Sequence, residues 1–391
     1  MSVGPPAGVH AGDLDDSFER ALRLLELGDC VMPFTVRAIA ALGVADHLAA
    51  GPRTVEELAG ATQTDARALH KALRALASRA IFAEVEPGWF ALTPIAEILR
   101  SDHPFSLRDA YRLRSAEADA WAAFGDCIRT GEPAFDRVHS RSYWDHLASH
   151  PAESAEVDRS MQSYTRLHLR TVLPAYDWSG LGTVVDAGGG NGAFLAGLLA
   201  RHPTMLGVLF DLPHVVANAA PVLEEAGVAD RCRVVAGSFF DGPLPAGADA
   251  YVLKTVLPGF DDERAAAILR SVRAAMRPGS RLLILEAVLP PGDAFDVAKL
   301  VDVNTLLLTG GAHRSTGHMH DLLADAGLDV VRMIPTTTLT IVEAEPIAAP
   351  TVGSQAMSPV GCATRGSSVG SPGAPRVTAV LRPPGATGSR G

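Results

Sequence analysis

The sequence predicts an α/β protein in which a helical N-terminal part precedes a mainly parallel β-sheet. Short apolar segments rich in β-branched residues alternate with helical patterns from residue 183 to about residue 346, as in sheets whose parallel strands are joined by crossover helices. The strands are expected at residues 183–187, 206–211, 232–236, 249–254, 281–287, 328–334 and 338–344. The last two are joined only by Pro335-Thr-Thr337, which is too short for a crossover helix, so we expect them to be antiparallel.

The N-terminal part, residues 17–100, predicts a winged-helix arrangement, in which three helices precede a β-hairpin. The sequence Thr54-Val-Glu-Glu57 is a capping box, which marks the start of a helix. Leu69, Leu73 and Leu76 recur at helical spacing after it. The expected elements are a helical stretch from Ser17 to Ala50 broken near Pro33, helices that open at Thr54 and at Thr64-Asp65, and strands at 81–85 and 89–92.

Three further segments complete the predicted organisation. Residues 101–175 are expected to be helical and to line a substrate pocket with aromatic side chains, and residues 176–346 form the domain of the sheet. Residues 1–16 are rich in Gly, Pro and Asp, and residues 347–391 are rich in Gly, Pro, Ser, Ala and Thr without periodicity. Both ends are therefore predicted to be disordered.

Composition argues against several classes of partner. The 391 residues carry a formal net charge of −10, which disfavours binding to nucleic acid or to an anionic membrane. A winged-helix DNA-binding regulator is therefore disfavoured, although the third helix carries Arg67, Lys71, Arg74 and Arg79. The four cysteines lack metal-ligand spacing, and no signal peptide or membrane-spanning run is apparent. A cytoplasmic protein without a membrane partner is expected.

A glycine-rich turn after the first strand of the sheet predicts a nucleotide-type cofactor site. Gly188, Gly190 and Gly192 allow a tight turn and a close approach of a ligand to the backbone. Asp211 ends the next strand, where its carboxylate can accept hydrogen bonds from a ribose. The glycine spacing fits NAD(H) as well as S-adenosylmethionine, but the antiparallel end of the sheet favours S-adenosylmethionine, because it is the sheet pattern of methyltransferases.

Several motifs in a fixed order strengthen this interpretation. They are Asp186-Ala-Gly-Gly-Gly-Asn-Gly192, Phe210-Asp-Leu-Pro213, Gly237-Ser-Phe-Phe240, Asp249-Ala-Tyr-Val-Leu-Lys254, Phe260-Asp-Asp-Glu263, Leu285-Glu-Ala-Val-Leu-Pro290 and Gly310-Gly311. Over about residues 17–346 the chain resembles the small-molecule O-methyltransferases of plant caffeate type and of bacterial polyketide tailoring in antibiotic biosynthesis. The resemblance implies a Rossmann-like methyltransferase sheet, a winged-helix dimerisation domain and a homodimer.

The resemblance also implies roles for individual residues toward the cofactor S-adenosylmethionine. Gly188, Gly190 and Gly192 would pack against its methionine part, and Asp211 would hold its ribose. Asp186 opens the same glycine motif and counts among the expected cofactor-binding residues. Ser238 and Phe239 would border its adenine, and Lys254 would lie near it at the end of the fourth strand.

The chain departs from the family pattern where the reaction needs a base. The family's catalytic His lies in a Leu-His-Asp-Trp sequence, and the matching stretch here is Leu257-Pro258-Gly259-Phe260. Proline cannot accept a proton. Of two family glutamates near that His, one matches Glu286 and the other is replaced by His313, which becomes the candidate catalytic base. An unperturbed imidazole there predicts a rate that rises through a pKa near 6.5. Another family Asp is replaced by Ser238.

The expected function is therefore S-adenosylmethionine-dependent O-methylation of a hydroxyl on an aromatic or polyketide-type secondary metabolite. Two alternatives stay open at this point. One is a tailoring enzyme of the same fold that binds S-adenosylmethionine without methylating, as a hydroxylase or cyclase, and the other is a C- or N-methyltransferase. His313, His318 and His320 also suggest a metal site, but the last two are only two residues apart, so no metal is expected.

Overall fold

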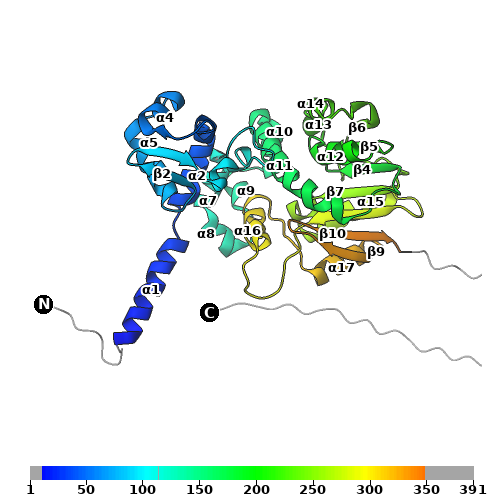
Figure 1. Cartoon of the computed structure of the whole chain (residues 1–391). Coiled ribbons are helices and arrows are strands. Elements are labelled where there is room, and N and C mark those ends of the chain that lie inside the picture. The colour runs from blue at the N-terminus through cyan, green and yellow to red at the C-terminus, as the bar shows by residue number, and fades with distance from the viewer. Residues whose placement is uncertain (1–10, 113, 348–391) are drawn as a thin grey trace, which may run out of the picture. The chain divides into compact units, whose positions relative to one another are not determined.

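The computed structural model describes residues 11–112 and 114–347 (Figure 1). The expectations of disorder for residues 1–10 and 348–391 lie outside these described ranges. Within them, a helical N-terminal part with a small sheet precedes a large mixed sheet, which confirms the predicted fold class. Among the described residues, none of the helices combines the length and the apolar character that crossing a membrane requires.

The N-terminal part has the helices and the hairpin expected of a winged helix. The Thr54 hydroxyl accepts from the Glu57 backbone N–H while the Glu57 carboxylate accepts from the Thr54 N–H, so the predicted capping box is present. The sheet has the order β1-β3-β2. The elements are α1 (Ala11–Leu27), α2 (Val31–Leu42), α3 (Val44–His47), β1 (Arg53–Thr54), α4 (Val55–Thr62), α5 (Ala66–Ala77), β2 (Phe82–Glu86), β3 (Trp89–Leu92) and α6 (Pro94–Glu97).

Two details of this region differ from the prediction. The helical stretch breaks between Leu27 and Val31, and Pro33 lies in the first turn of α2, where its missing N–H costs no helical hydrogen bond. Helix α1 begins at Ala11, so residues 11–16 were wrongly expected to be disordered. Asp16 forms an ion pair with Arg20 one turn later, which supports this extension of the helix.

The segment that joins the two sheets is helical, as expected. Its helices are η1 (Asp109–Tyr111), α7 (Ser115–Ala122), α8 (Phe124–Thr130), α9 (Ala134–His139), α10 (Tyr143–Ser149), α11 (Pro151–Val172) and η2 (Leu173–Ala175). Phe135 and Tyr143 pack with Leu307 and Leu308 of α16 (Val297–Thr309) in one buried cluster. This contact joins the helical segment to the domain of the large sheet.

The large sheet has seven strands in the order β6-β5-β4-β7-β8-β10-β9. The first five in this order are parallel, and β10 pairs antiparallel with both β8 and β9, which confirms the predicted end of the sheet. Each strand begins and ends within two residues of its predicted limits. The strands are β4 (Thr183–Ala187), β5 (Leu206–Asp211), β6 (Cys232–Ala236), β7 (Ala250–Lys254), β8 (Arg281–Glu286), β9 (Leu328–Pro335) and β10 (Thr340–Pro346).

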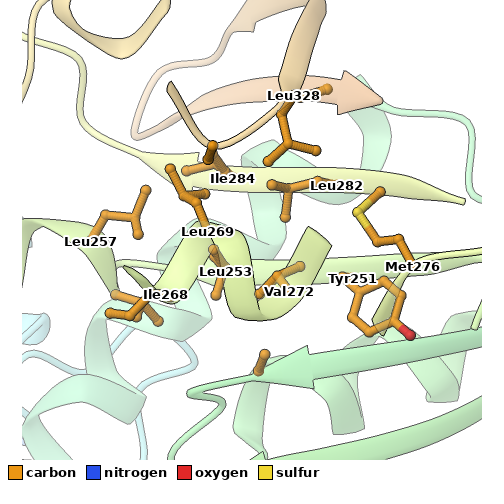
Figure 2. Packing of buried hydrophobic residues seen from close by; sticks show 14 of the residues in the cluster. Tyr251, Leu253, Leu257, Ile268, Leu269, Val272, Met276, Leu282, Ile284 and Leu328 are labelled. Atoms are coloured by element: carbon orange, nitrogen blue, oxygen red, sulfur yellow. The ribbon is translucent and has the colours of Figure 1, made fainter. Parts of the chain in front are cut away.

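Helices cover both faces of this sheet and bury two separate apolar clusters. In Figure 2, Leu269 and Val272 of α15 (Asp262–Ala275) lie over side chains of β7 and β8 such as Leu253 and Ile284. Burying one such side chain fully stabilises the fold by about 1.5–3 kcal/mol. The remaining elements are α12 (Ala193–Arg201), α13 (Pro213–Val216), α14 (Ala219–Glu225), η3 (Ala229–Arg231), η4 (Leu257–Gly259) and α17 (Thr316–Asp325). This packing fixes the carboxyl ends of β4, β5 and β7, where the predicted site residues lie.

Candidate active site

The glycine turn between β4 and α12 has the backbone conformation that the sequence predicts. The φ angles of Gly188, Gly190 and Gly192 are +72°, +64° and +82°, values that residues other than glycine rarely adopt. The Gly188 N–H donates to the carbonyl of Phe210 at 2.7 Å, so the turn is tied to the adjacent strand β5. The turn therefore lies beside the carboxyl end of β5, where Asp211 stands.

Asp211 is oriented by two backbone donors. One carboxylate oxygen accepts from the Gly190 N–H at 2.8 Å and the other from the Leu212 N–H at 2.7 Å. Burial raises the pKa of Asp211, and these two hydrogen bonds counteract the shift. The carboxylate is thus fixed next to the glycine turn, where it can accept hydrogen bonds from the hydroxyl groups of a ligand.

Space around the glycine turn differs sharply between neighbouring residues. A Cβ atom on Gly190 would meet no other atom within 4 Å, so the turn is open there. A Cβ atom on Gly189 would lie 2.6 Å from the carboxyl carbon of Asp186 and 2.5 Å from Leu209. The turn is therefore closed against the sheet at Gly189 and open to a ligand at Gly190.

Beneath the turn lies a cluster of titratable groups, in which Asp186 is buried and Lys254 and His168 are half-buried. Asp186 is fully buried and neither of its carboxylate oxygens has a hydrogen-bond partner among the described residues. Burial raises the pKa of Asp186 and lowers that of Lys254, while their opposite charges act in the other direction on both. His168 of α11, to which the sequence assigned no role beside the cofactor, lies near Lys254. Burial and the charge of Lys254 lower the pKa of His168 to about 3. This imidazole is neutral at physiological pH.

Ser238 and Phe239 follow β6 on the far side of Asp211. The Ser238 hydroxyl accepts from the Phe240 N–H at 3.1 Å, which shapes the loop rather than supplying a charge. The ring of Phe239 packs edge-on against that of Phe210, with ring centroids 5.8 Å apart. The ring of Phe239 would lie 3.3 Å from a Cβ atom built on Gly188, so it borders the glycine turn.

Pro258 lies in the short helix η4 that follows β7. Its neighbour Leu257 donates its backbone N–H to the Glu286 carboxyl at 3.0 Å. Burial raises the pKa of Glu286 to about 8, and this hydrogen bond only partly counteracts the shift. Glu286 is therefore mostly protonated at neutral pH and holds the turn of Pro258 in place.

His313 is buried, with 7% of its surface exposed. Its Nδ1 atom lies 3.1 Å from the carbonyl oxygen of Ala287, and its backbone N–H donates to Asp302 of α16 at 2.7 Å. A carbonyl oxygen can only accept, so Nδ1 carries the hydrogen and Nε2 is the basic nitrogen. Burial lowers the pKa of His313 below its ordinary value, so the expectation of a pKa near 6.5 is corrected downward.

Arg314, which sequence reasoning missed, joins the loop of His313 to the turn of Pro258. Its guanidinium donates to the carbonyls of Leu257 and Phe260, each at 3.1 Å, and forms an ion pair with Asp262. The side chain is completely buried. The backbone of Gly311 also lies directly against residues 258–260, where a Cβ atom would come within 2.0 Å of the Pro258 carbonyl oxygen. Two loops that are distant in sequence are thus packed as one unit.

The histidines near this loop do not share a common centre. His318 pairs with Asp262 at 2.8 Å, whereas His313 bonds to Ala287. Within the described ranges, the group with metal-ligand geometry is His146 of α10, His150 between the two helices and Glu153 of α11. There the His146 and Glu153 side chains already bond to each other at 3.0 Å.

The donors and acceptors at the turn fit S-adenosylmethionine. An oriented carboxylate at a strand end suits the two hydroxyls of a ribose. The open face at Gly190 leaves room for a ligand against the backbone, and the unpartnered oxygens of Asp186 are hydrogen-bond acceptors close to it. A cationic sulfonium ligand with a ribose matches these features.

Comparison with known proteins identifies the family. Residues 121–329 match the O-methyltransferase domain and residues 25–102 match the O-methyltransferase dimerisation domain. The chain is 41% identical to phenazine O-methyltransferase PhzM of Lysobacter antibioticus, over 79% of this chain and 91% of that protein. It is 35% identical to aclacinomycin 10-hydroxylase RdmB of Streptomyces purpurascens, over 84% of this chain and 87% of that one.

A solved structure extends the likeness to the fold. The O-methyltransferase NcsB1 from neocarzinostatin biosynthesis, in complex with S-adenosylmethionine and 2-hydroxy-5-methyl naphthoic acid, superposes with a TM-score of 0.71. It is 38% identical in sequence, and the match covers 82% of this chain and 98% of that one. The chain therefore belongs to the family of S-adenosylmethionine-dependent O-methyltransferases.

Proposed function

We propose that this enzyme methylates a hydroxyl group of an aromatic secondary metabolite and that His313 is its catalytic base. One observation carries the assignment of the base: the imidazole of His313 has its Nδ1 hydrogen fixed on Ala287, which leaves Nε2 as a proton acceptor. The loop of His313 packs against the turn of Pro258 through Gly311. Nε2 accepts no hydrogen bond from the described residues.

The proposed cofactor site consists of residues from four strand ends. Asp211 holds the ribose hydroxyls, and the turn from Gly188 to Gly192 supports the methionine part. Phe239 and Ser238 border the adenine, and Asp186 with Lys254 sets the charge beneath the turn. The open face at Gly190 and the fixed carboxylate of Asp211 support this arrangement.

Other candidates for the base are less suitable. Pro258 has no proton acceptor in its side chain. Glu286 carries a proton at neutral pH and already accepts the Leu257 N–H, so it cannot readily take another proton. The pKa of His168 is so low that it is a weak base. Burial lowers the pKa of His313, so its imidazole is neutral at physiological pH and free to accept a proton.

The mechanism follows from these roles. S-adenosylmethionine supplies a methyl group on a positively charged sulfur. A phenol has a pKa of about 10, so the acceptor oxygen becomes a good nucleophile when Nε2 of His313 takes its proton. The contacts of His313 with Ala287 and Asp302 fix the base. Holding the reacting groups in line can lower the barrier by about 7–11 kcal/mol.

A homodimer is part of this proposal. Phe18, Leu22 and Leu25 of α1 lie on one helix face and are 64%, 50% and 72% exposed. An apolar helix face of this kind is stable in water only when another surface covers it. We propose that a second copy of the chain covers it.

The test is incubation of the enzyme with S-adenosylmethionine labelled in its methyl group and a panel of hydroxylated naphthoates, phenazines and anthracyclines. We expect label in an O-methyl group of at least one product. Product formation that needs bound cofactor but carries no label would instead establish the hydroxylase or cyclase alternative, which the likeness to RdmB favours as second candidate. Label on carbon or nitrogen would contradict O-methylation.

A further inference from the structure

A cavity of about 490 Å³ lies between the segment 101–112 and helix α11, and arginines from both segments line it. We name it the arginine pocket. Its lining residues are Ser101, His103, Pro104, Ser106, Arg108, Asp109, Arg112, Arg159 and Arg166. In a chain with a formal net charge of −10, four arginines around one cavity form a local excess of positive charge.

Two of these arginines keep buried donors without partners. Arg166 donates through Nη2 to the Ser106 carbonyl and to the Ser163 hydroxyl, both at 3.1 Å, but its Nε is buried and unpartnered among the described residues. Arg108 pairs with Asp46 at 2.6 Å, and its Nε is likewise buried without a partner. Buried N–H groups are almost always hydrogen-bonded, so these two side chains keep unused donor capacity next to the pocket.

The positive charges of the pocket are only partly compensated. Arg112 bonds to Asp109 at 3.0 Å and lies 3.8 Å from Glu156. Asp109 is the single acidic residue of the lining. Arg159 and Arg166 form no ion pair with any carboxylate in residues 11–112 and 114–347. Two guanidinium charges therefore remain for a ligand.

His103 adds a further donor. Its Nδ1 accepts the backbone N–H of Phe105 at 3.1 Å, so in the neutral ring the hydrogen lies on Nε2. The Ser101 hydroxyl already donates to Asp46, so the donors that the lining can offer come mainly from the guanidinium groups and His103, while its single carboxylate is engaged by Arg112. Such a set of donors selects an anion.

We infer that the arginine pocket binds a phosphoryl group, either free phosphate or a small phosphate monoester. Guanidinium groups from two segments suit a dianion with several oxygens better than a carboxylate, which one planar guanidinium can satisfy. The pocket is separate from the proposed cofactor site. Arg159 and Arg166 are seven residues apart and therefore lie on one face of α11. His168, which lies near Lys254 of the proposed cofactor site, is on a different face of the same helix.

The experiment is calorimetric titration of the full-length enzyme with inorganic phosphate, phenyl phosphate or benzoate, with sodium chloride holding the ionic strength constant. The variants are Arg159→Gln, which removes an exposed arginine, and Arg166→Gln. Arg170→Gln on the same helix is the matched control, because Arg170 is exposed and does not line the pocket. Melting temperatures confirm that each variant is folded.

We expect saturable binding of one phosphate or phenyl phosphate per chain, and a dissociation constant at least tenfold higher in Arg159→Gln and in Arg166→Gln. Arg170→Gln should change it less than twofold. Tighter binding of phenyl phosphate than of inorganic phosphate would identify a monoester as the ligand, and the reverse would identify free phosphate. Absence of saturable binding, tighter binding of benzoate than of phosphate, or phosphate binding unchanged in Arg159→Gln would each overturn the inference. Absence of binding would also be the result if a carboxylate of a second copy of the chain filled the pocket.

Discussion

The Nδ1 atom of His313 donates a hydrogen bond to the backbone carbonyl of Ala287 at 3.1 Å, and this contact determines which nitrogen of the ring can act as a base. Ala287 follows directly after Glu286, the carboxyl group that holds the turn of Pro258. Pro258 stands where the family has its catalytic His, and the imidazole of His313 is oriented by the segment Glu286-Ala287, which also holds the turn of Pro258.

The first prediction concerns the pH dependence of methylation. A base must be neutral to accept a proton, so the rate of wild-type enzyme should rise with pH through the pKa of His313. Because burial lowers that pKa, the rise should occur below pH 6.5. His313→Ala should remove this rise and lower kcat on the order of 10²-fold.

His318→Ala is the matched control, since His318 is an exposed imidazole five residues away that pairs with Asp262. His318→Ala should keep both the rise of the methylation rate with pH and the kcat of the wild type. A wild-type rate left unchanged in His313→Ala would exclude His313 as base and leave orientation of the reactants as the mechanism.

The second prediction concerns Asp211. Asp211→Ala should weaken binding of S-adenosylmethionine, because a charge-assisted hydrogen bond contributes about 1.5–3 kcal/mol, which corresponds to roughly 10- to 150-fold in the dissociation constant. Calorimetry of the purified variant measures the change. Asp230→Ala removes an exposed carboxylate from η3 and should leave the affinity unchanged. Equal affinity of wild type and Asp211→Ala would contradict the assignment of Asp211.

The third prediction links Glu286 to stability. Its pKa is raised from 4.5 to about 8 in the folded state, so the folded enzyme binds a proton that the unfolded chain releases at lower pH. Stability from this group is complete below the unfolded pKa and is lost as the pH rises toward 8, with a slope of up to about 1.4 kcal/mol per pH unit. Denaturant unfolding at a series of pH values should show that the free energy of unfolding falls less steeply with rising pH in Glu286→Gln than in the wild type.

Glu345→Gln, which changes an exposed glutamate at the far end of β10, is the control and should follow the wild type. Glu286→Gln retains an oxygen that can accept the Leu257 N–H, so it should remain folded. Identical pH profiles for wild type and Glu286→Gln would mean that Glu286 is ionised in the folded enzyme.

The fourth prediction concerns assembly. Leu25→Asp places a charge in the exposed apolar face of α1, and burying an unpaired charge in an interface is strongly unfavourable. Sedimentation at micromolar concentration should show a dimer for wild type and for Glu19→Ala, which changes an exposed polar residue of the same helix, and a monomer for Leu25→Asp. A wild-type monomer would contradict the proposed homodimer.

The sequence was sufficient to predict the strands, because alternation of apolar strands with helices and the short Pro335–Thr337 connection leave few possible topologies. It also indicated the glycine turn and Asp211, since both depend on local backbone geometry. The role of Arg314 could not be predicted from the sequence. Its acceptors are backbone carbonyls of Leu257 and Phe260, more than fifty residues earlier, and such groups carry no sequence signal.

The burial of His313 was also unpredictable, because it depends on Asp302 of α16 and on the carbonyl of Ala287. A histidine in a loop has no local pattern that reports such partners. The same holds for the low pKa of His168, which arises from packing of α11 near Lys254. Tertiary contacts, rather than residue type, set the protonation of both rings.

The last prediction tests the open face of the glycine turn. Gly190→Ala introduces a methyl group where the structure has no atom within 4 Å, but it also forces alanine into a conformation with φ of +64°. That backbone strain costs roughly 1–2 kcal/mol. Gly131→Ala is a matched control for the strain, because Gly131 has φ of +75°, is equally unobstructed and lies at the end of α8, outside the turn.

Both variants should lower the melting temperature by a similar amount, whereas only Gly190→Ala should weaken binding of S-adenosylmethionine, by at least tenfold. The reason is that its methyl group occupies the space that the cofactor needs, whereas the methyl group of Gly131→Ala does not. Gly189→Ala should behave differently from both, because its methyl group would overlap Asp186 and Leu209, so the loss should appear first in folding. Unchanged cofactor affinity in a folded Gly190→Ala enzyme would show that the ligand does not approach the turn at this residue.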